Sequence, residues 1–157
     1  MEFLNKLPVS AHFQEIKEKW SQTGSFAIKA PTGSGKSLGI PLLLLNERLI
    51  KGRILIVQPR RVAARNLAKV ASKFNRTDLG HEIGYKVRFD SRVSQKTKII
   101  YLTDGMLFRL LQSPESLADV ELLIFDEFHE RTLFMDSSLA LAKFYTENKK
   151  ISAKILI

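Results

Sequence analysis

The segment APTGSGKS at residues 30–37 constrains the fold of this chain more than any other stretch of it. It follows the apolar run SFAIKA (25–30) and precedes the apolar run LGIPLLLL (38–45), so a strand, a tight loop and a helix are expected in that order. Gly33 and Gly35 allow the backbone to turn so tightly that successive N–H groups face one anion, and the N-terminus of the helix adds its positive end. This pattern fits the P-loop, which cradles nucleotide phosphates.

Each position of this loop has an expected role toward a nucleotide. Lys36 would reach the β- and γ-phosphates, and the Ser37 hydroxyl would coordinate Mg²⁺. Leu38 stands where a second hydroxyl residue is common, so its contact with the α-phosphate must come from its backbone N–H. Pro41 removes a backbone donor early in the following helix and is expected to bend it. The predicted nucleotide-binding residues are Thr32, Gly33, Ser34, Gly35, Lys36, Ser37 and Leu38.

A second polar segment, DEFHER at residues 126–131, ends the largely apolar run VELLIF. Ligands of parallel α/β sheets bind at the carboxyl ends of the strands, so this segment is expected to face the glycine loop. Asp126 is placed to hold Mg²⁺, directly or through water, and Glu127 is placed to orient and deprotonate an attacking water. Taken alone, the segment could also be a strand end that enters a polar turn. Together with the loop, it predicts a site that hydrolyses ATP or another nucleoside triphosphate with Mg²⁺.

Strand-like and helix-like segments alternate along the chain. Several strand-like runs are almost continuously apolar, which is typical of a sheet with helices on both faces. The expected strands are residues 25–30, 53–58, 83–89, 98–103, 121–126 and 153–157, and the clearest helical patterns are residues 11–20 and 62–74. The pattern predicts an α/β fold with a central, mostly parallel sheet between two layers of helices.

Basic residues concentrate in the middle of the chain. The formal net charge is +9, and residues 51–98 carry 13 lysine and arginine residues against 3 acidic ones. Basic residues recur every fourth position along one expected helix, which predicts a basic stripe of Arg61, Arg65, Lys69 and Lys73. Clustered basic charge indicates a polyanionic partner such as nucleic acid, and the alternative is a solvated face that only aids solubility.

The composition excludes several classes of protein. Of the 157 residues, 45% are hydrophobic and 26% are charged, as in a globular domain rather than a disordered chain. The chain has no cysteine, so it forms neither a disulfide framework nor a thiolate metal site. Its start, MEFLNKLPVS, lacks the pattern of a signal peptide, and the run IPLLLL is far too short to span a bilayer. We therefore expect a cytoplasmic protein without a membrane partner.

Five ordered segments resemble the DEAH/DExH-box RNA helicases of superfamily 2. APTGSGKS resembles their motif I, QPRRVAA (58–64) motif Ia, TDGML (103–107) motif Ib and DEFHER motif II, and IGYKVRFD (83–90) is similar to a further segment of that group. The opening LPVSAHFQEI and the phenylalanine in DEFHER look most like the bacterial HrpB-type branch. The resemblance implies that residues 1–157 form a single RecA-like ATP-binding domain.

The resemblance also implies roles for individual residues. It makes Lys36 and Glu127 catalytic, together with His129, which would couple the nucleotide site to a partner domain. The residues implied to lie on the nucleic-acid path are Arg60, Arg61, Thr103 and Asp104, with Arg88 as a weaker member. Because the basic segment contains few aromatic residues, we expect phosphate and sugar contacts with little reading of base sequence.

Some parts implied by the resemblance are absent from the chain, including the Ser-Ala-Thr motif, the second motor domain and its arginine fingers. The chain also ends at Ile157 inside an expected strand, so we expect a fragment that stops before the third motif. The predicted function is the first motor domain of an ATP-dependent RNA helicase or translocase, nearly inactive alone. Its expected partners are RNA (single-stranded, or else DNA) and a second RecA-like domain. Two alternatives stay open: a nucleic-acid-binding module without turnover, and a P-loop ATPase that is not a helicase.

Overall fold

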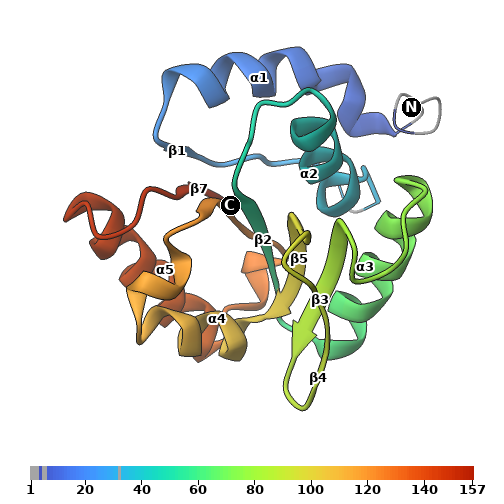
Figure 1. Ribbon diagram of the computed structural model, residues 1–157. Helices are drawn as coiled ribbons and strands as arrows, with labels where there is room; N and C mark the ends of the chain where they lie inside the picture. Colours follow the sequence, from blue (N-terminus) through green and yellow to red (C-terminus); the bar gives the residue numbers. More distant parts are fainter. Residues whose placement is uncertain (1–3, 5–6, 32) are drawn as a thin grey trace.

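In the computed structural model, which describes residues 4, 7–31 and 33–157, seven strands of the described residues form one sheet (Figure 1). The strands are β1 (Ser25–Phe26), β2 (Arg53–Gln58), β3 (Ile83–Val87), β4 (Asp90–Arg92), β5 (Ile99–Thr103), β6 (Val120–Phe125) and β7 (Lys154–Leu156). They lie in the order β1-β7-β6-β2-β5-β3-β4, and every neighbouring pair is parallel except β3 and β4. The predicted α/β fold with a mostly parallel sheet is confirmed.

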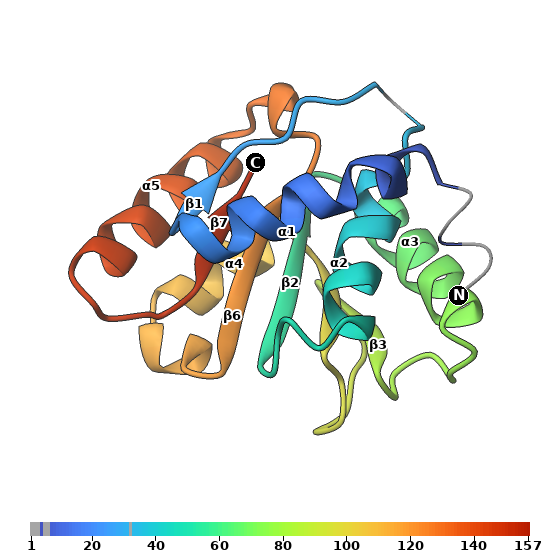
Figure 2. The same cartoon turned by 90° about the horizontal axis from the view of Figure 1, so that it is seen from above.

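Helices cover both faces of this sheet. They are α1 (Phe13–Gln22), α2 (Lys36–Asn46), α3 (Arg61–Phe74), α4 (Asp104–Leu111) and α5 (Leu133–Glu147), with the 3₁₀ turns η2 (Pro8–His12), η3 (Pro114–Leu117) and η4 (Phe128–Glu130). Ile54 and Ile56 of β2 pack into the core shared with α1, α2 and α3, whereas the residues that alternate with them pack against α4 and α5. Figure 2 shows β6 and β2 between these two groups of helices. Among the described residues, none of the helices combines the length and the hydrophobicity that a bilayer span requires.

Two strands, β1 and β3, end at least two residues earlier than the sequence predicts. Strand β1 has only two residues, although the Ile28 N–H still donates to the Ile157 carbonyl at 2.8 Å. The predicted strand over residues 83–89 is wrong at its end, because β3 stops at Val87 and the chain turns back into β4. Val87 pairs with Asp90, so Arg88 and Phe89 form the tip of a hairpin, and Phe89 has a left-handed φ of 65°.

Helix α2 contains a proline whose missing donor is replaced from the sheet. An ordinary residue at position 41 would donate its N–H to the carbonyl of Ser37, four residues earlier, and Pro41 has no N–H to donate. The Tyr101 hydroxyl, which is fully buried on β5, donates to this Ser37 carbonyl at 2.8 Å. Tyr101 therefore satisfies the backbone group that the proline leaves unpaired. The expected bend at Pro41 stays a prediction.

Candidate active site

The glycine loop lies between β1 and the N-terminus of α2. Gly33 and Gly35 have φ values of 77° and 84°, a conformation that other residues rarely adopt. A Cβ atom on Gly35 would also lie 3.1 Å from Cδ2 of Leu7, so a side chain there would be crowded as well as strained. The Val9 N–H donates to the Ser34 carbonyl at 3.0 Å and ties the loop to η2. Thr32 of the predicted set lies outside the described residues.

The side chain of Lys36 folds back onto the backbone of its own loop. Lys36 Nζ donates to the carbonyls of Ala30 at 2.7 Å and Pro31 at 3.1 Å. These two acceptors are neutral, so a phosphate oxygen would be the stronger partner for the ammonium. The Leu38 N–H makes a long bond of 3.3 Å to the Gly35 carbonyl in the first turn of α2.

The carboxylate of Asp126 lies directly after β6 and is almost completely buried. The amide of Gln58, at the end of the neighbouring strand β2, donates to Asp126 Oδ2, and the Asp126 N–H donates to the Val57 carbonyl at 3.1 Å. Within the described residues, no donor reaches the other oxygen, Oδ1. Asp126 and Ser37 line the same cavity of about 550 Å³. One free carboxylate oxygen and one hydroxyl suit Mg²⁺, which completes its coordination with water and substrate phosphates.

The turn after Asp126 is bounded by two residues in the left-handed region. Glu127 has a φ of 52° and Arg131 a φ of 47°, on either side of η4. Backbone strain of this kind occurs often at functional sites. The Glu127 carboxylate lies 3.5 Å from Nδ1 of the exposed His129, and Arg131 is fixed by Asp136, whose carboxylate accepts from its Nε at 2.8 Å. Glu127, His129 and Lys36 also line the cavity that Asp126 lines.

The strand order divides the carboxyl edge of the sheet into two halves. Strand β6, which ends at Asp126, neighbours β2, and beyond β2 lie β5 and β3. Because these strands are parallel, the predicted nucleic-acid residues after β2, β5 and β3 lie at the same edge as the phosphate loop. An ion pair links the segment after β2 to the turn after β6, since Arg60 Nη2 lies 3.3 Å from Glu130 Oε1.

The predicted nucleic-acid residues differ in exposure. Arg60, Arg61 and Arg88 are exposed, whereas Thr103 and Asp104 are buried. The Asp104 carboxylate accepts from the Gly105 N–H at 2.7 Å and from the Thr132 hydroxyl, which caps the N-terminus of α5. The structure thus gives Asp104 a role in joining the starts of α4 and α5. Direct contact of these five residues with nucleic acid stays a prediction.

Sequence reasoning assigned no role to Gln58, Tyr101 and Phe89. Gln58 could have been found, since a polar residue at the end of a buried strand needs a partner and Asp126 ends the neighbouring strand. Tyr101 gave a weaker signal, as a hydroxyl inside an apolar run. Its burial, with the negative charge of Asp126 nearby, raises the pKa of the phenol. Phe89 is 90% exposed at the hairpin tip, beneath the guanidinium of Arg88, and gave no signal.

Comparison with known proteins agrees with this geometry. The family model described as "DEAD/DEAH box helicase" matches residues 11–149. The chain is 36% identical to the ATP-dependent RNA helicase HrpB of Escherichia coli over 154 residues, which are 98% of this chain and 19% of that protein. It is 37% identical to the probable ATP-dependent RNA helicase DHR2 of Saccharomyces cerevisiae over 155 residues, which are 96% of this chain and 21% of that protein. The chain thus spans about a fifth of the length of these curated relatives.

The fold is shared with a solved structure. The crystal structure of the Escherichia coli DEAH/RHA helicase HrpB matches 96% of this chain and 19% of its own chain, with 38% identity and a TM-score of 0.90. The matched region is a RecA-like domain, as the resemblance implied. The family model, the curated relatives and this structure agree, and the chain belongs to the DEAD/DEAH box helicase family.

Proposed function

We propose that this chain is the first RecA-like motor domain of a longer ATP-dependent RNA helicase or translocase. The observation that carries the proposal is the single cavity in which the loop lysine and serine meet the two acidic residues after β6. Family membership supports nucleotide use, and the relatives, which are named as RNA helicases, indicate RNA as the substrate class. The domain boundaries and the cytoplasmic compartment stay predictions.

In this proposal Lys36 exchanges its two loop carbonyls for the β- and γ-phosphates of the nucleotide. Ser37 and Asp126 would hold Mg²⁺, which would supply positive charge to neutralise the phosphates. Glu127, which lines the cavity, orients the attacking water and accepts its proton. His129, which reaches the Glu127 carboxylate, carries the state of the site to the partner domain.

The exposed arginines after β2 and β3 form the proposed path for the nucleic-acid backbone. Arg60, Arg61 and Arg88 neutralise phosphates, so binding is expected to depend strongly on salt and little on base sequence. Asp104, which follows Thr103 directly at the junction of β5 and α4, acts by holding the start of α4 against the start of α5. We propose single-stranded RNA as the ligand because one row of strand-end loops follows one backbone.

Two variants of the full-length protein test the nucleotide site. Lys36→Ala should mainly weaken Mg²⁺–nucleotide binding, because the lysine holds charge in the ground state, whereas Glu127→Gln should mainly abolish turnover. The measurements are fluorescent-nucleotide titration and RNA-stimulated phosphate release. An equal loss of affinity in both variants would contradict these roles. A rate of phosphate release that does not change with added RNA would favour a P-loop ATPase that is not a helicase. RNA binding without nucleotide turnover would favour a pure binding module.

The 157-residue chain alone should hydrolyse nucleotide poorly. Arginine fingers of a second domain would be missing, and one such residue is worth about 10³–10⁵ in rate. Steady-state hydrolysis by the chain at the rate of the full-length protein would refute the need for a second domain.

A further inference from the structure

The hairpin of β3 and β4 presents a short, highly exposed tip. Only Arg88 and Phe89 separate the paired residues Val87 and Asp90, and Phe89 occupies the left-handed region with a φ of 65°. The Arg88 guanidinium lies 4.7 Å from the centre of the Phe89 ring. These contacts are confined to the tip, so its direction must be set where the hairpin meets the rest of the domain.

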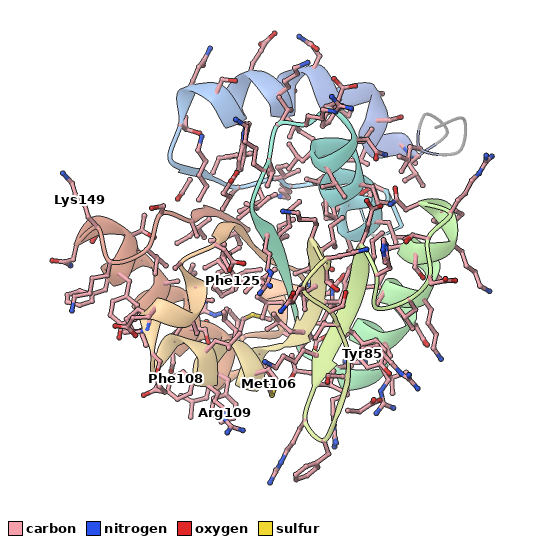
Figure 3. The ribbon with its side chains drawn as sticks, in the orientation of Figure 1. Tyr85, Met106, Phe108, Arg109, Phe125 and Lys149 are labelled. Carbon is pink, nitrogen blue, oxygen red and sulfur yellow. The ribbon has the colours of Figure 1, made fainter. Side chains whose placement is uncertain are left out.

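One carboxylate makes that connection. Asp90 Oδ2 lies 2.8 Å from Arg65 Nη2 of helix α3, and the Tyr85 hydroxyl of β3 lies 3.2 Å from Asp90 Oδ1 and 3.0 Å from Oδ2. Tyr85 is itself buried in the core that includes Ala64 and Ala68 of α3. Figure 3 shows Tyr85 on the hairpin strand beside α3. The first residue of β4 is therefore fastened to both a helix and the opposite strand.

Arg65 is unlike the other members of the basic stripe. Arg61, Lys69 and Lys73 are exposed and make no ion pair with a described residue, whereas Arg65 is half-buried and forms an ion pair with Asp90 through one of its nitrogens. Its Nε is buried without a hydrogen-bond partner among the described residues. At least one nitrogen of its guanidinium is therefore bound to the hairpin, which distinguishes Arg65 from a free surface arginine.

We propose that Arg65 is a positioning residue for nucleic-acid binding: through Asp90 and Tyr85 it fixes the hairpin tip so that Arg88 faces the backbone of the bound strand. The inference rests on the proposed function, because it assumes that Arg88 contacts nucleic acid. It assigns Asp90, an acidic residue on a basic surface, a favourable effect on binding a polyanion. A tip that is ordered before binding loses no backbone conformational entropy when the complex forms. For one residue, that loss corresponds to about a five- to thirtyfold change in an equilibrium constant.

The decisive variant is Asp90→Asn in the full-length protein. Electrostatics alone predicts tighter RNA binding, since the variant removes a negative charge from a basic surface. Positioning predicts the opposite, because the loosened tip must be ordered on binding; the electrostatic gain offsets part of this cost, so we expect a net loss of about three- to tenfold. Asp78→Asn is the matched control: it removes an exposed charge from the same basic segment, the Asp78 carboxylate makes no hydrogen bond or ion pair with a described residue, and the variant should leave affinity equal or slightly improved.

The assay is fluorescence anisotropy with a labelled single-stranded RNA over a range of salt concentrations. Arg65→Gln should weaken binding by at least the same factor as Asp90→Asn, because it also removes a positive charge, and the double variant should be no weaker than Arg65→Gln alone. Additive losses would mean that Arg65 contacts the phosphate itself, and they would overturn the inference. Unchanged or tighter binding by Asp90→Asn would also overturn it. Nucleotide affinity should stay constant in all variants, which shows that the domain remains folded.

Two further measurements separate this inference from the proposed function. Arg88→Gln should weaken RNA binding, and if it does not, or if the wild-type protein does not bind RNA, the proposed path fails and the role of Arg65 fails with it. If Arg88→Gln weakens binding and Asp90→Asn does not, only the positioning role fails. Hydrogen exchange at the tip amides needs no RNA and should be faster in Asp90→Asn than in Asp78→Asn. Equal exchange would show that the tip does not depend on Asp90.

Discussion

The hydrogen bond from Tyr101 to the carbonyl of Ser37 leads to a sharp prediction about the start of helix α2. In Tyr101→Phe the ring stays and only the hydroxyl is lost, so the packing of this fully buried side chain changes little. The Ser37 carbonyl then loses its donor, and Pro41 has no N–H to replace it. The variant therefore isolates one backbone group beside the phosphate loop.

The expected size of the effect follows from the fate of that carbonyl. A buried acceptor left without a donor costs about 1–3 kcal/mol. Ser37 is only partly buried, so water offsets part of the loss, and we expect about 1–2 kcal/mol. For a chain of this size, that corresponds to a fall in Tm of about 2–8 °C.

Pro41→Ala provides the partner experiment. Alanine restores an N–H at the position that normally bonds the Ser37 carbonyl, so Tyr101→Phe should cost about 0.5 kcal/mol or less in the Pro41→Ala background. Urea unfolding, followed by the fluorescence of the buried Trp20, measures all four proteins of this cycle. An equal cost of Tyr101→Phe in both backgrounds would refute the compensation between tyrosine and proline.

Two further predictions concern stability. Burial and the nearby charge of Asp126 raise the pKa of the Tyr101 phenol, so the unfolded chain loses this proton near pH 10 while the folded chain keeps it. The free energy of unfolding should therefore fall by up to about 1.4 kcal/mol per pH unit above pH 10. Urea titrations at alkaline pH should show this slope in the wild-type protein and not in Tyr101→Phe. Gly39→Ala should destabilise the protein by about 1–3 kcal/mol despite the helix preference of alanine, because the new Cβ would lie 2.6 Å from Cγ1 of Val9. Gly24→Ala, where nothing lies within 4 Å, is the matched control, and equal midpoints in thermal unfolding would contradict the clash.

The sheet could be predicted because its strands are buried on both faces. Such strands are continuous apolar runs, and β2, β5 and β6 lie within one residue of their predicted bounds. The prediction missed the hairpin of β3 and β4 for a physical reason. Its turn contains neither glycine, proline nor asparagine, and Phe89 adopts a left-handed conformation that local preferences disfavour.

The candidate site could be predicted as far as its backbone positions. The glycine loop and Asp126 follow strands of one parallel sheet, so their meeting at one edge follows from the fold class. The partners of individual side chains could not be predicted in this way. Asp104 and Arg65 carry charges that read as surface features in sequence, yet each is held by a residue far along the chain, Thr132 and Asp90 respectively. Those pairings depend on how helices pack, which local patterns do not encode.

The position of β1 has a consequence for the order of folding. Its only strand neighbour among the described residues is β7, and the Ile155 N–H donates to the Ser25 hydroxyl across a sequence separation of 130 residues. During synthesis, the strand that leads into the phosphate loop must therefore wait for nearly the whole domain to emerge before it can pair. Contacts of such long range close slowly, because the entropy of the intervening loop is lost first. The glycine loop is thus encoded early in the chain, but its flanking strand is among the last to pair, so we expect a nascent domain not to bind nucleotide before its sheet is closed.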